Sequence, residues 1–68
     1  LDAGQGLPEH RAPGVLLVEC LEGRVRFDVE GVPHELDAGA LLLVPDRAPH
    51  AVEARAPSRL RLVIARAD

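Results

Sequence analysis

Hydrophobic and polar residues alternate along several short segments of the chain. Residues 24–30 carry charged side chains at even positions and apolar side chains at odd positions, and residues 50–56 and 59–66 alternate in a similar way. A period of two is typical of a β-strand with one buried face and one solvated face. The side chains expected to point inward are Val25, Phe27, Val29, His50, Val52, Ala54, Leu60, Leu62 and Ile64.

Two other segments are apolar at both odd and even positions. Residues 15–22 and residues 40–44 place hydrophobic side chains on both faces of a predicted strand. A strand that is buried on both faces needs a covering layer on each side. In so short a chain we expect a second subunit to supply the outer layer, and therefore a homodimer.

Glycine and proline mark the turns between these segments. A short strand is predicted at residues 34–37, and residues 1–14, which are rich in glycine and proline, are predicted to form an extended loop or an irregular edge strand that carries His10. The pattern gives about six short strands and no helical period. We therefore expect one all-β domain over residues 1–68, an antiparallel sandwich or barrel. A segment preceding Leu1 stays open, because the chain does not begin with methionine.

Composition narrows the classes of partner. The chain has 68 residues, a net charge of −3 and a single cysteine. One cysteine permits no internal disulfide, and a domain of this size is marginally stable alone, which points to oligomerisation, an unusually good core or a lost part of the chain. The acidic balance gives no reason to expect binding to nucleic acid or to an anionic membrane. Without a long apolar segment or a signal peptide pattern, a cytoplasmic location is expected.

The spacing of three turn and strand residues resembles a motif of the cupin family, whose members are jelly-roll barrels. Gly39, Pro45 and His50 match the second cupin motif in register, with Arg47 at its glycine position and Ala54 at its asparagine position. The first cupin motif contains two histidines and a glutamate, and its positions can be counted back from Gly23. His10 stands at the first histidine, Ala12 at the second histidine and Leu16 at the glutamate. The resemblance covers roughly residues 8–66 and implies a small jelly-roll barrel of the conserved cupin-2 type.

The resemblance also raises the question of whether this chain binds a metal ion. Cupins hold iron, manganese, zinc, nickel or similar metals with three histidines and one glutamate, and this chain keeps His10 and His50 of those four ligands. A divalent transition metal usually takes at least three protein ligands. We therefore expect weak metal binding at best. His34 shares a face with Leu36 and has no support as a third ligand, and Cys20 is expected to pack as a small hydrophobic residue.

The predicted site is a mostly apolar pocket in which His10 and His50 are the polar side chains. The other residues assigned to the pocket are Leu16, Val18, Cys20, Phe27, Arg47, Val52, Leu60, Leu62 and Ile64. Three functions stay open. The first is a barrel that binds a small molecule, the second is a metal-dependent dioxygenase or isomerase that uses His10 and His50, and the third is a structural domain with a filled barrel. No catalytic residue and no specific activity are identified.

Overall fold

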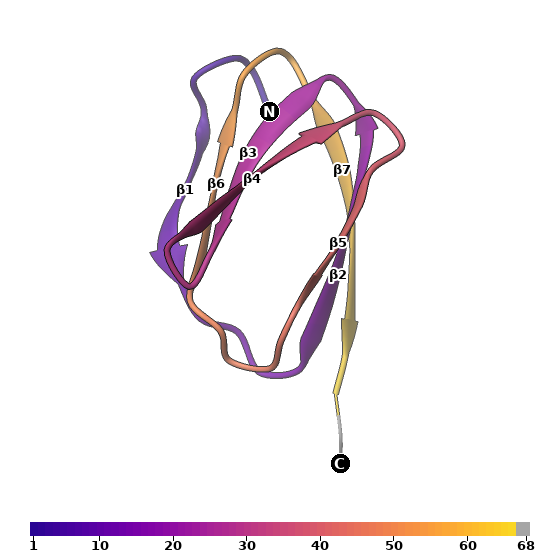
Figure 1. Cartoon of the computed structure of the whole chain (residues 1–68). Helices are drawn as coiled ribbons and strands as arrows, with labels where there is room; N and C mark the ends of the chain where they lie inside the picture. The colour runs from indigo at the N-terminus through magenta and orange to yellow at the C-terminus, as the bar shows by residue number, and fades with distance from the viewer. Residues whose placement is uncertain (67–68) are drawn as a thin grey trace.

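Two antiparallel sheets face each other in the computed structural model, which describes residues 1–66 (Figure 1). One sheet has the strand order β1-β6-β3-β4 and the other has the order β5-β2-β7. The strands are β1 (Gly6–His10), β2 (Val15–Glu22), β3 (Arg24–Val29), β4 (Val32–Asp37), β5 (Leu41–Val44), β6 (His50–Ala54) and β7 (Arg59–Ala65). The all-β antiparallel jelly-roll fold expected from the sequence is confirmed.

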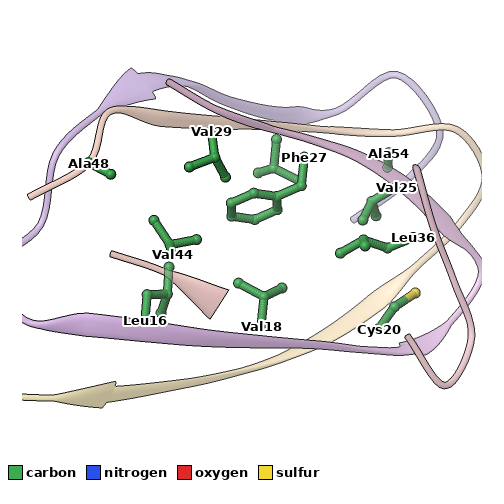
Figure 2. Packing of buried hydrophobic residues seen from close by; sticks show 11 residues of the cluster. Leu16, Val18, Cys20, Val25, Phe27, Val29, Leu36, Val44, Ala48 and Ala54 are labelled. Carbon is green, nitrogen blue, oxygen red and sulfur yellow. The ribbon is translucent and has the colours of Figure 1, made fainter. Parts of the chain in front are cut away.

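The core fills the space between the sheets at the centre of the molecule. Val25 and Phe27 of β3 point toward Val18 and Cys20 of β2, and Figure 2 shows these side chains meeting between the two layers. Val18, Cys20 and Val25 are completely shielded from solvent. Because side chains alternate across each strand, the inward positions predicted from residues 24–30 and 50–56 are the ones that become buried.

The first fourteen residues are more regular than predicted. Gly6–His10 forms β1, an edge strand that pairs with β6, so residues 1–66 contain seven strands. The pairing is irregular between Leu7 and His10, around Pro8, which has no N–H to donate. All five residues of β1 are exposed, so buried and exposed side chains do not alternate along it. Its backbone pairing with β6 identifies it as a strand.

The two outer faces of the sandwich differ in character. The four-stranded sheet carries exposed ion pairs on its outside, among them Arg24–Asp37 and Arg55–Glu35. On the outside of the three-stranded sheet, Leu41 and Leu43 are each 61% exposed. No element of residues 1–66 covers this side, and the predicted cover from a second subunit stays a prediction. No helix within the same residues is long and apolar enough to cross a membrane.

Candidate functional site

A cavity of about 510 Å³ lies between the inner faces of the sheets, on the side bounded by the edge strands β1 and β7. Five strands contribute to it, and its lining is mostly apolar. The lining residues are Leu1, Leu7, His10, Ala12, Leu16, Phe27, His50, Val52, Ser58, Arg59, Leu60, Leu62 and Ile64. Leu62 and Ile64 belong to the inner face of β7 but stay 53% and 54% exposed, because this side of the sandwich is open.

Two histidines meet in this cavity. His10 of β1 and His50 of β6 are cross-strand partners, and their ring centroids lie 4.2 Å apart with the planes at 65°. His50 is 4% exposed, whereas His10 is exposed. An edge-on arrangement of this kind brings the two rings into direct contact.

Backbone carbonyl groups hold both rings through the same nitrogen. Nδ1 of His10 lies 2.9 Å from the carbonyl oxygen of Pro8, and Nδ1 of His50 lies 2.9 Å from that of Ala48. A carbonyl oxygen can only accept, so Nδ1 is the protonated nitrogen of each neutral ring in these hydrogen bonds. The Nε2 atoms then carry lone pairs that can accept hydrogen bonds or bind a Lewis acid.

The phenyl ring of Phe27 supports the buried histidine. Its centroid is 5.8 Å from that of His50 with the planes at 15°, a stacked arrangement. Phe27 is itself only 2% exposed and belongs to the core, so its position is fixed by packing. His50 is therefore held by one hydrogen bond, by one stacked ring and by the edge of His10.

All four positions that the cupin motifs assign to metal ligands line the same cavity. His10, Ala12, Leu16 and His50 come together there. Ala12 and Leu16 offer no donor atom, and no group of three or more His, Cys, Asp or Glu side chains that could hold a metal occurs in residues 1–66. The residues present do not fit a divalent metal that requires three protein ligands.

Most of the other predicted pocket residues also gather at the cavity. Those that line it are Leu16, Phe27, Val52, Leu60, Leu62 and Ile64. Val18 and Cys20 point inward as predicted, but they lie further along β2, where side chains such as Val25 and Leu36 cover them (Figure 2). Alternation along a strand predicts which face of the sheet a side chain lies on, but not where along the sandwich it lies. It therefore could not distinguish residues that line the cavity from residues of the core.

Arg47 lies away from this cavity. It lines a second space of about 470 Å³ with Asp46, Arg66 and residues 13–15, and no histidine contributes to that space. Its backbone has φ of +59°, in the left-handed region that glycine adopts without strain. The cupin motif has glycine at this position, the residue that adopts such a conformation most readily.

Some lining residues were missed from the sequence. Leu7 is the cross-strand partner of Val52 and joins the cavity because residues 6–10 form a strand. Ser58 and Arg59 join it from the turn before β7 and from the first residue of that strand. His34, by contrast, pairs with Phe27 across β3 and β4 and does not line the cavity.

Comparison with known proteins decides the family. The profile of the family described as Cupin domain matches residues 1–65. The chain belongs to the cupin family. No curated protein matches this cupin.

Solved structures share the fold over nearly the whole chain. A conserved protein of unknown function from Streptococcus pyogenes has a TM-score of 0.96 and 26% identity, covering 100% of this cupin and 60% of that chain. A cupin 2 conserved barrel domain protein from Leptotrichia buccalis has a TM-score of 0.82 and 31% identity, covering 96% and 32%. A salicylate 1,2-dioxygenase from Pseudaminobacter salicylatoxidans has a TM-score of 0.87 and 22% identity, covering 91% and 18%. This cupin therefore spans less than two thirds of the length of these proteins.

Proposed function

We propose that this cupin binds a small, largely apolar molecule in the cavity between its sheets, and that His10 and His50 contact the polar end of that molecule. The observation that supports the proposal is the pair of imidazoles, each held through Nδ1, in a cavity whose other walls are mostly apolar. Concave apolar sites with a few convergent polar groups are the usual form of small-molecule sites, and about 510 Å³ lies within their typical range.

The chemistry of the two rings suggests the polar group of the ligand. A neutral Nε2 accepts a hydrogen bond, so a hydroxyl or amine N–H of the ligand can be bound there. Among residues 1–66, the cavity lining contains no carboxylate that could attract a cation, and the side-chain cation found there, Arg59, is paired with Glu22 at 2.9 Å. A ligand with an apolar body and one hydroxyl group, such as a phenol, fits these walls best.

A metal-dependent dioxygenase or isomerase is the second candidate. Its support is the position of His10 and His50 at two ligand positions of the cupin motifs, together with the fold shared with a dioxygenase at 22% identity. Two imidazoles alone leave a zinc, iron, manganese or nickel ion without enough protein ligands. The third candidate, a barrel filled by side chains, does not agree with a cavity of about 510 Å³.

Titration of the isotope-labelled protein with phenol and with toluene tests the leading proposal by NMR. We expect phenol to shift the backbone amide signals of His50 and Leu62 and to bind more tightly than toluene, because toluene lacks the hydroxyl group. His50→Leu should remove the preference for phenol. His34→Leu is the matched control, because His34 does not line the cavity.

Two results would contradict the proposal. Binding confined to the space around Arg47 would place the site elsewhere, and equal affinity for phenol and toluene would remove the role of the histidines. A parallel titration with Zn²⁺ addresses the second candidate. Stoichiometric, tight zinc binding that is lost in His50→Leu would favour the metal-dependent enzyme over the proposed binding protein.

A further inference from the structure

Three of the eight arginines lack a close carboxylate partner within residues 1–66, and they lie at one end of the sandwich. Arg47 reaches only Asp46, its neighbour in the sequence, at 3.5 Å. Arg11 and Arg66 form no ion pair within the same residues. The other five each lie within 3.0 Å of a carboxylate oxygen, and they are Arg24, Arg26, Arg55, Arg59 and Arg61.

The three arginines lie around the space of about 470 Å³ that residues 13–15, 46–47 and 65–66 enclose, here called the arginine pocket. Arg66 directly follows β7 and lies against the backbone at Gly14. A Cβ atom at Gly14 would be only 3.0 Å from Cγ of Arg66 and 2.6 Å from the carbonyl oxygen of Ala65. The absence of a side chain at Gly14 therefore allows Arg66 to lie at the wall of the pocket.

Two loops form the opposite wall of the arginine pocket. Figure 1 shows the β1–β2 loop and the β5–β6 loop together at the lower end of the molecule, where β7 also ends. The loops are joined by hydrogen bonds, because the N–H of Gly14 donates to Asp46 Oδ1 at 2.7 Å and the N–H of Arg47 donates to the carbonyl oxygen of Ala12 at 3.2 Å. Nη1 of Arg11 lies 3.4 Å from the carbonyl oxygen of Arg47, which places a third positive charge beside the pocket.

The charged side chains at the arginine pocket leave a positive balance. Arg11, Arg47 and Arg66 supply three positive charges, and among residues 1–66 the lining contains one carboxylate, that of Asp46. Both oxygens of this carboxylate have partners, Oδ1 the N–H of Gly14 and Oδ2 the guanidinium of Arg47. Two positive charges therefore stay unbalanced at this end of a chain whose net charge is −3.

We propose that the arginine pocket binds a phosphate group between Arg47 and Arg66, as free phosphate or as the monoester of a small molecule. A phosphate monoester carries a charge of about −2 at neutral pH, which matches the balance of the pocket, whereas a monocarboxylate carries only half of it. Planar guanidinium groups bind phosphate oxygens through paired N–H donors. A volume of about 470 Å³ has room for the phosphate and for a small organic group attached to it.

The arginine pocket and the cavity between the sheets lie on opposite sides of β2 and β7. The cross-strand partners Val15 and Ala65 line the pocket, and the next pair along the strands, Leu16 and Ile64, lines the cavity. Successive side chains of a strand point to opposite faces, so the two spaces are separated by the sheet itself. Phosphate binding is therefore independent of the binding proposed for the cavity, and either one can fail in experiment while the other holds.

NMR titration of the isotope-labelled chain with inorganic phosphate, at constant pH and ionic strength, tests the proposal. We expect the amide signals of Gly14 and Arg47 to shift with a dissociation constant in the low millimolar range, while those of His50 and Leu62 stay in place. Acetate should bind at least about tenfold more weakly, because it carries one negative charge. A titration with glycerol 3-phosphate distinguishes the two sources: tighter binding than inorganic phosphate indicates a monoester, and equal or weaker binding indicates the free ion.

Three substitutions examine the pocket itself. Arg47→Gln and Arg66→Gln should each raise the dissociation constant for phosphate at least about fivefold, because each removes charge-assisted hydrogen bonds. Asp46→Asn keeps an oxygen for the N–H of Gly14 but removes the negative charge from the wall, so it should bind phosphate more tightly. Arg24→Gln is the matched control, because it loses the same charge on β3, where Arg24 pairs with Asp37, and its affinity should change less than about twofold.

Three results would overturn the proposal. The first is no shift of the Gly14 and Arg47 signals at tens of millimolar phosphate, and the second is acetate binding as tight as phosphate binding. The third is equal weakening in Arg24→Gln and in the two pocket variants, which would show attraction to the overall charge instead of a site. Circular dichroism checks that each variant is folded, which we expect because Arg24, Arg47 and Arg66 are exposed.

Discussion

The imidazole of His50 contacts the imidazole of His10 edge-on, with 4.2 Å between ring centroids, although forty residues separate them in the sequence. Strand pairing between β1 and β6 produces this contact, and a backbone carbonyl fixes each ring through Nδ1. Both rings line the cavity with Nδ1 held, which leaves Nε2 of each ring for other partners. Four predictions examine the two histidines, position 12 beside them, the turn at Arg47 and the buried thiol of Cys20.

Removing the buried imidazole should destabilise the fold. His50→Ala leaves the carbonyl oxygen of Ala48, a residue only 5% exposed, without its hydrogen bond, and removes the ring stacked on Phe27. Loss of one partner of a buried hydrogen bond costs about 1–3 kcal/mol. We expect a decrease of about 2 kcal/mol in the free energy of unfolding measured in urea. His10→Ala is the comparison, and because His10 is exposed its cost should stay below about 1 kcal/mol.

Restoring a third donor should create metal affinity. Ala12 lines the cavity with His10 and His50, so Ala12→His adds a third imidazole to the same walls. Three histidines satisfy the minimum protein ligand set of many zinc sites. We expect Ala12→His to bind Zn²⁺ at least about tenfold more tightly than the parent chain in calorimetric titration. Unchanged affinity would show that position 12 is not directed toward the two histidines.

The strained turn at Arg47 should accept glycine. Arg47 has φ of +59°, and an L-residue in the left-handed region loses about 1–2 kcal/mol relative to its ordinary conformations. Glycine adopts this region freely, although its greater freedom in the unfolded chain offsets about 0.4–1 kcal/mol. Arg47→Gly should therefore be more stable than Arg47→Ala by about 0.5–1 kcal/mol in thermal or urea unfolding. Equal stability of the alanine and glycine variants would show that backbone strain at this turn does not lower the stability of the fold.

The buried thiol should make stability depend on pH in the alkaline range. Burial raises the pKa of Cys20, and the negative charge of Asp37 raises this pKa further. The folded pKa lies above the unfolded one, so the unfolded thiol ionises first. The stabilising contribution is complete below the ordinary thiol pKa of about 8.5 and is lost as the pH rises toward the folded pKa.

Urea unfolding at a series of pH values from neutral to about 10, a range that includes the ordinary thiol pKa, measures how stability depends on the ionisation of Cys20. The free energy of unfolding of the parent chain should fall more steeply above pH ~8.5 than that of Cys20→Ala, which lacks the thiol. Parallel curves for the two proteins would contradict the prediction. Reaction of the folded protein with a thiol reagent should also be slow, because Cys20 is fully buried and its thiol stays protonated.

Local patterns in the sequence predicted the strands from residue 15 onward and their inward faces, and the resemblance to the cupin motifs pointed to both site histidines. The alternation in residues 24–30 and 50–56 places Phe27 and His50 inward because successive side chains of a strand point to opposite faces. Gly39, Pro45 and His50 carried the cupin resemblance because turns and strand starts depend on local backbone chemistry. These features need no knowledge of distant contacts.

Only the tertiary structure decided which strands are neighbours and what lies between them. Residues 6–10 become β1 through hydrogen bonds to β6, which brings His10 against His50. Position along the sandwich separates Leu16 at the cavity from Val18 in the core, although both point inward. Exposure of Leu41 and Leu43 on the outer side of β5 likewise depends on whether another layer covers them. Pairing, layer order and cavity volume arise from contacts between segments far apart in the chain, which a local period cannot specify.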